Sequence, residues 1–96
     1  MPEEYELQPR HARAKSFYGK ARVRLDDFRN QGLISYGTPV CWYDPNERKL
    51  HRLWDRWSAT TGRHIDEFAR QTLGAAVGKN EWDAMEVEPL PPFLRP

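Results

Sequence analysis

The sequence predicts a small α+β domain, with an antiparallel sheet of three to four strands and one main helix packed on one face. Three patterns predict this class: apolar and polar residues alternate over 17–25, two further strand-like runs flank a turn at 44–48, and apolar residues recur at helical spacing over 65–73. A chain of 96 residues has room for one hydrophobic core. We therefore expect a single folded unit over residues 15–88.

Both ends of the chain are expected to lie outside this unit. Residues 1–14 carry few apolar side chains, and burying them would not offset the entropy of ordering, which predicts a flexible N-terminal arm. Residues 89–96 contain four prolines. Proline excludes a regular helix and a central strand, so these residues are expected to form an extended, Pro-rich tail.

The strands are predicted from patterns with a period of two residues. The clearest alternation covers residues 17–25 and indicates a half-buried strand. Further strands are expected over 33–36, 39–43 and 49–56. The turn-forming residues at 44–48 join the last two strands into a hairpin.

A helix is predicted to begin near residues 58–61, where three hydroxyl side chains can accept the unpaired backbone N–H groups of a first turn. Apolar residues then recur at positions i, i+3, i+4 and i+8, the stripe of an amphipathic helix. They are Ile65, Phe68, Ala69 and Leu73. A glycine, Gly74 or Gly78, is expected to end the helix. Residues 79–87 are compatible with a helix or a strand, with Trp82 returning to the core.

Charge and hydropathy exclude several classes of protein. The chain has 15 Lys+Arg and 14 Asp+Glu, a formal net charge of +1, which excludes an acidic DNA mimic and a strongly basic nucleic-acid coat protein. No apolar run approaches the ~18–20 residues of a membrane span, and the first residues lack the basic and apolar regions of a signal peptide. We therefore expect a soluble, cytoplasmic protein with no membrane partner.

Residues suited to catalysis or metal binding are sparse in the sequence. The three histidines, His11, His51 and His64, show no spacing that would bring ligands together, so no metal and no cofactor are predicted. Cys41 is the only cysteine and has no basic neighbour, which favours a small buried residue over a nucleophile. No Gly-x-Ser-x-Gly elbow surrounds Ser58. We expect a non-enzymatic protein without catalytic residues.

A basic strand face offers a nucleic-acid-binding alternative. Six cations and no acid lie between Leu7 and Leu25, and an aromatic residue shares their face. Such a face can bind phosphates and stack a base. The residues are Arg13, Lys15, Tyr18, Lys20, Arg22 and Arg24. The competing interpretation is that the solvent face of any antiparallel sheet is polar.

Aromatic residues are concentrated in the predicted hairpin and at the start of the helix. Both faces of the hairpin carry aromatic residues or leucines, and one helix covers only one face, so some of these side chains are expected to be exposed. Exposed Trp, Tyr and Arg are typical of protein-binding surfaces. The candidate partner-binding residues are Tyr43, Trp54, Arg56, Trp57, Arg63 and His64.

Three segments carry a resemblance to a known family. They read SYGTPVCWY at 35–43, HRLWDRWSATTGRHIDEFARQ at 51–71 and KNEW at 79–82. With these segments the chain resembles an uncharacterised family of short proteins carried by phages, plasmids and other mobile elements.

That resemblance implies an accessory or counter-defence role, since small proteins in this setting include anti-CRISPR inhibitors. The partner that it implies is a host protein, such as a Cas effector, that is inhibited by steric blocking. Association into a homodimer stays open.

Overall fold

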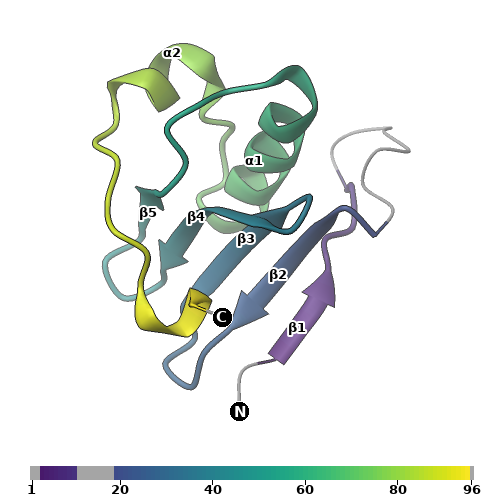
Figure 1. The fold of residues 1–96 in the computed structure, drawn as a ribbon, viewed down its shortest axis with the longest axis vertical. Coiled ribbons are helices and arrows are strands. Elements are labelled where there is room, and N and C mark those ends of the chain that lie inside the picture. The colour runs from purple at the N-terminus through teal and green to yellow at the C-terminus, as the bar shows by residue number, and fades with distance from the viewer. Residues whose placement is uncertain (1–2, 11–18, 96) are drawn as a thin grey trace.

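A computed structural model describes residues 3–10 and 19–95, and in these residues it shows a five-stranded antiparallel sheet with two α-helices (Figure 1). In order across the sheet, the strands are β1 (Glu3–Glu6), β2 (Ala21–Leu25), β3 (Gln31–Ser35), β4 (Thr38–Asp44) and β5 (Lys49–Arg52). The helices are α1 (Ala59–Thr72) and α2 (Gly78–Ala84), and a 3₁₀ turn follows at Pro92–Leu94. The α+β class is confirmed. Within the described residues, however, the sheet has five strands instead of three or four, and a short second helix follows the main one.

The N-terminal residues 3–10 join the fold in place of the flexible arm expected there. β1 pairs antiparallel with β2, and beyond the strand Leu7 is buried, with its backbone N–H donating to the Ala21 carbonyl at 2.8 Å. Strand pairing satisfies backbone groups whatever the side chains are, so a polar segment can extend a sheet edge. Residues 11–14 of the expected arm, and residues 17–18 of the first predicted strand, lie outside the described residues.

The core lies between α1 and one face of the sheet. Three of the four residues in the predicted apolar stripe are buried, and the fourth, Leu73, is 41% exposed at the end of the helix. The predicted hydroxyl cap is confirmed: the Ser58 side chain accepts a hydrogen bond from the Thr61 N–H at 3.1 Å. The fully buried strand residues include Val23, Leu33 and Cys41.

The predicted β4–β5 hairpin is confirmed, although β5 ends earlier than expected, at Arg52. The backbone N–H groups of Leu53 and Trp54 both donate to the Val40 carbonyl, at 2.9 and 3.1 Å, so the chain turns away from the ladder there. Of residues 79–87, for which the sequence allows a helix or a strand, 79–84 belong to α2. The Trp82 ring is fully buried, as expected.

Gly62 lies in α1 against the Trp57 ring. A Cβ atom added here would lie 2.4 Å from Trp57 Cζ2, far inside contact distance. We expect Gly62→Ala to lower the free energy of unfolding by about 1–2 kcal/mol, because the clash outweighs the ~1 kcal/mol that alanine contributes over glycine in a helix. Urea denaturation measures this change. In a Trp57→Ala background the same substitution is expected to stabilise, and an equal loss in both backgrounds would contradict the assigned clash.

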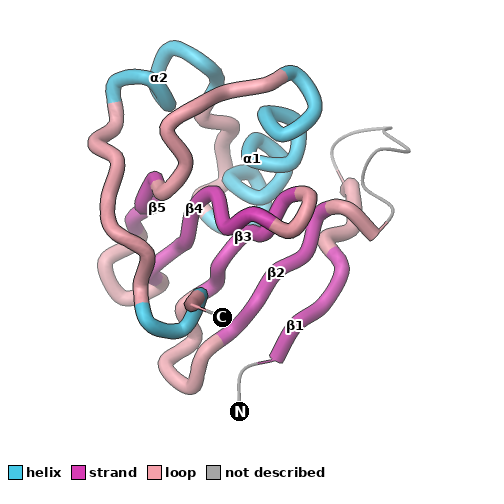
Figure 2. Tube along the Cα trace, viewed as in Figure 1, coloured by secondary structure: helices cyan, strands magenta, loops and turns pink. Residues whose placement is uncertain are grey.

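The C-terminal tail crosses the sheet face opposite α1. From α2 it passes β5, where the Glu88 N–H donates to the Arg52 carbonyl at 2.8 Å, and reaches β3, as Figures 1 and 2 show. Leu94 is 2% exposed and occupies the space that a side chain at Gly32 would fill. A proline-rich segment needs few internal hydrogen bonds, so it can lie on a sheet without leaving many donors unpaired.

Candidate functional site

The sheet face that carries the tail also carries a stack of rings. Trp42 on β4 pairs across the ladder with His51 on β5, and their rings stack with centroids 4.1 Å apart and an interplanar angle of 11°. Phe93 from the tail meets Trp42 edge to face at 5.9 Å. Trp42 thereby links the hairpin to the tail, and its ring is held on two sides.

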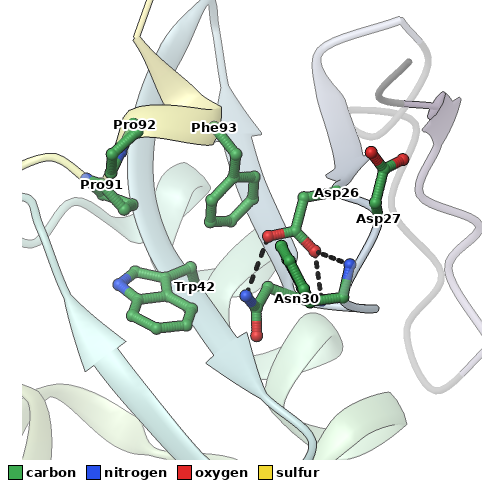
Figure 3. Close-up of a pocket in the computed structure, with 8 residues that line it drawn as sticks. Asp26, Asp27, Asn30, Trp42, Pro91, Pro92 and Phe93 are labelled. Carbon is green, nitrogen blue, oxygen red and sulfur yellow. Dashed lines mark hydrogen bonds between the residues drawn. The ribbon is translucent and has the colours of Figure 1, made fainter.

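An open hollow of about 550 Å³ lies beside these rings (Figure 3). It is formed between the β2–β3 turn on one side and the tail on the other, with β4 between them. The lining residues are Asp26, Asp27, Phe28, Asn30, Trp42, Pro91, Pro92 and Phe93. Because most of this lining is ring carbon, the hollow suits an apolar group better than a charged one.

The β2–β3 turn holds Phe28 out in solvent. Asp26 Oδ1 accepts hydrogen bonds from the backbone N–H groups of Phe28 and Asn30 at 2.8 and 2.9 Å, and Oδ2 accepts one from Asn30 Nδ2 at 2.9 Å. Arg29 takes the left-handed conformation, with φ at +67°. The side chain of Phe28 is 76% exposed at the edge of the hollow. Its exposure is therefore imposed by a hydrogen-bonded turn.

The six partner-binding residues predicted from the sequence differ in their exposure to solvent. Tyr43 and His64 are buried in the core and have almost no surface to offer a partner. Trp54 and Trp57 are half-buried and pack against the core. The remaining two, Arg56 and Arg63, are exposed. Four of the six residues therefore belong wholly or partly to the core.

Residues of the predicted basic face lie partly opposite acidic residues of β1. Arg22 and Arg24 both bind Glu4, at 2.6 and 3.0 Å. The hydrogen bond from Arg22, aided by Arg24, lowers the pKa of Glu4 despite some desolvation. Lys20 is exposed and lies over the Tyr36 ring at 5.7 Å. Arg13, Lys15 and Tyr18 lie outside the described residues.

A serine and a histidine meet inside the core. Ser35 Oγ lies 2.8 Å from His64 Nδ1 and 3.1 Å from Thr61 Oγ1, which is the separation of a nucleophile and its base. Ser35 is 3% exposed and His64 is fully buried, so a substrate has no access to this pair. We assign it the structural role of orienting α1 on β3. Burial also raises the pKa of the Cys41 thiol, which makes it a poor nucleophile.

The residues of the hollow were not among the predicted sites. One signal was present in the sequence: Phe28 is an apolar residue between turn formers, Asp26-Asp27 before it and Asn30 after it. An aromatic side chain in such a turn has no strand face to bury it. Phe93 carried no comparable signal, because its place on Trp42 depends on the path of the tail.

A sheet with a helix on one face and the chain's own tail on the other defines a small α+β domain, and its apolar hollow gives it a surface suited to binding. The chain belongs to a family of unknown function (DUF8033), whose model matches residues 5–84. That match covers most of the sheet and both helices, and it stops where α2 ends, before the tail. No curated protein and no solved structure matches the chain. None of the helices in the described residues is long and apolar enough to cross a membrane.

Proposed function

We propose that this protein is a non-enzymatic binding protein whose hollow, together with Phe28, receives an apolar segment of a partner protein. The observation that carries the proposal is the exposure of Phe28, 76%, at the rim of an apolar hollow. Water is a poor environment for a phenylalanine ring, so a side chain held in this state is suited to an interface.

The rigidity of the surface supports a binding role. Asp26 fixes the β2–β3 turn through three hydrogen bonds, and His51 and Phe93 hold the Trp42 ring. A surface that is already ordered loses little conformational entropy when a partner docks, which favours affinity. Aromatic side chains in such surfaces commonly dominate the binding energy.

A protein partner fits this surface better than a small ligand. A ligand enclosed by Trp42, Pro91 and Phe93 would leave most of Phe28 in water, whereas a protein segment that fills the hollow can also cover Phe28. From the resemblance of the sequence to proteins of mobile elements, the partner to test first is a host defence protein such as a Cas effector. In this proposal the protein inhibits its partner by sterically blocking the surface to which it binds.

Nucleic-acid binding through the basic strand face is the alternative function. It is less well supported, because Arg22 and Arg24 share the Glu4 carboxylate and so present less positive charge than their sequence pattern suggests. Steep loss of affinity for single-stranded nucleic acid with rising salt would favour this alternative.

The experiment measures binding of the wild-type protein, Phe28→Ser and Tyr36→Ser to purified host Cas effectors by biolayer interferometry. Tyr36 is the matched control, since it is 52% exposed in the β3–β4 turn and takes no part in the hollow. We expect Phe28→Ser to raise the Kd by about 30-fold, equivalent to roughly 2 kcal/mol, and Tyr36→Ser to leave it nearly unchanged.

Two outcomes would contradict the proposal in different ways. Equal affinity of wild type and Phe28→Ser for a bound effector would remove the hollow from the interface. Failure of every effector to bind, together with dimerisation that Phe28→Ser abolishes, would show that the hollow binds a second copy of this chain. Light scattering after gel filtration measures the second outcome.

A further inference from the structure

The turn between β4 and β5 gathers three side chains that are common metal ligands. Asp44 ends β4, Glu47 lies in the turn and His51 lies on β5. One oxygen from each carboxylate and one imidazole nitrogen lie within 4.8 Å of one another. The register pairs Asp44 with Lys49 and Trp42 with His51, so Asp44 and His51 project from the same sheet face.

His51 supplies an independent observation that points to a ligand. The residue is 8% exposed, and its Nδ1 lies 2.8 and 3.0 Å from the two carboxylate oxygens of Glu88. Its Nε2 is buried and has no hydrogen-bond partner among the described residues. A buried polar atom without a partner is costly, and such atoms are rare in folded proteins. Because Glu88 contacts Nδ1, Nε2 is the ring nitrogen that is available to bind an ion together with Asp44 and Glu47.

The contact with Glu88 also decides which nitrogen carries the proton when the ring is neutral. A neutral imidazole that donates its Nδ1 proton to a carboxylate carries a lone pair on Nε2, which is the form that binds metal ions. Metal-binding histidines commonly have a carboxylate on their second nitrogen, where it orients the ring and raises its basicity. The stacked Trp42 ring holds the imidazole plane from one side.

The carboxylates are arranged to receive a cation. Asp44 Oδ1 accepts hydrogen bonds from the backbone N–H groups of Asn46 and Glu47 at 2.9 and 3.3 Å, which leaves Oδ2 for a further contact. The carboxylate of Glu47 lies beside it in the same cluster.

We propose that Asp44, Glu47 and His51 bind a divalent transition-metal ion of the Zn²⁺ type, with Glu88 as the carboxylate that orients His51. Imidazole nitrogen and carboxylate oxygen are both zinc ligands, and three such donors leave a position of a tetrahedral ion open. Magnesium and calcium prefer oxygen-only ligands, so they are expected to bind more weakly. The ion would join the β4–β5 turn to the start of the tail, and its binding does not depend on the partner protein proposed above.

Calorimetric titration of the tag-free, full-length protein with zinc chloride tests the site, with magnesium and calcium chlorides as comparators. We expect binding of one equivalent of zinc and a higher Tm in its presence. His51→Gln and Glu47→Gln are each expected to weaken zinc binding at least about tenfold, and Glu88→Gln by about 10–100-fold. Glu47 is exposed, so its variant keeps the test valid if His51→Gln fails to fold.

Glu81→Gln is the matched control, because Glu81 is an exposed carboxylate on α2, outside the cluster. It should bind zinc as the wild type does, and so should Phe28→Ser, which separates this site from partner binding. The proposal is overturned if the wild type binds no zinc, if magnesium or calcium binds as tightly as zinc, or if Glu47→Gln keeps wild-type affinity.

Discussion

Arg52→Ala is expected to lower the free energy of unfolding by about 3 kcal/mol, because it removes a buried cation that three carbonyl groups share. Arg52 is 6% exposed, and its Nε donates to the Trp54 carbonyl at 2.8 Å. Its Nη1 donates to the carbonyls of Trp82 and Met85 at 2.9 and 3.1 Å, and the guanidinium lies 5.2 Å from the Trp82 ring centroid. Alanine would take one donor from each of these carbonyls, of which only that of Trp82 keeps a backbone donor, the Met85 N–H, and it would open a cavity beside the ring.

Urea denaturation followed by tryptophan fluorescence measures this loss. Arg52→Lys is expected to cause an intermediate loss of unfolding free energy, because one ammonium group cannot reach three carbonyls as a planar guanidinium does. Arg63→Ala is the control, because Arg63 is exposed on α1 and its removal should change stability by no more than about 0.5 kcal/mol. If the free energy of unfolding of Arg52→Ala lies within about 1 kcal/mol of the wild-type value, the cation is not needed to join β5 to α2.

Leu94→Ala is expected to lower the free energy of unfolding by about 2–4 kcal/mol, the usual range for a leucine removed from a closed site. Leu94 is 2% exposed, and three of its side-chain carbons would lie within 2.9 Å of a Cβ at Gly32. Its partner strand β3 is at the centre of the sheet, so the cavity cannot be closed by a loop movement. A tail that only extended into solvent would show no such effect.

Thermal or urea unfolding of Leu94→Ala, compared with Leu73→Ala, measures the contribution of the tail. Leu73 is the matched leucine, 41% exposed at the end of α1, and its loss should be small. Deleting residues 89–96 should destabilise at least as much as Leu94→Ala. If the deletion leaves stability unchanged, the tail does not pack on the sheet in solution.

Elements with local signals can be predicted from the sequence alone. The alternation in 17–25 contains β2, the turn residues at 44–48 join β4 to β5, and the apolar stripe with its Ser58 cap specifies α1. Each signal lies within one element, because the period of side-chain burial follows from the geometry of a strand or a helix alone. Burial of Trp82 was also predictable, since a large ring beside a helical turn needs cover.

The pairing of segments far apart in the chain depends on the tertiary structure. β1 is mostly acidic, and the alternation of Tyr5 and Leu7 with Glu4 and Glu6 is too short to predict a strand by itself. The edge of β2 gives its backbone a partner. The tail packs on β3 because Gly32 leaves space for Leu94. The hollow and the cluster around His51 arise in the same way, since Phe93 and Glu88 reach β4 and β5 from at least 37 residues further along the chain. Such contacts depend on three-dimensional complementarity, which no local pattern of residues encodes.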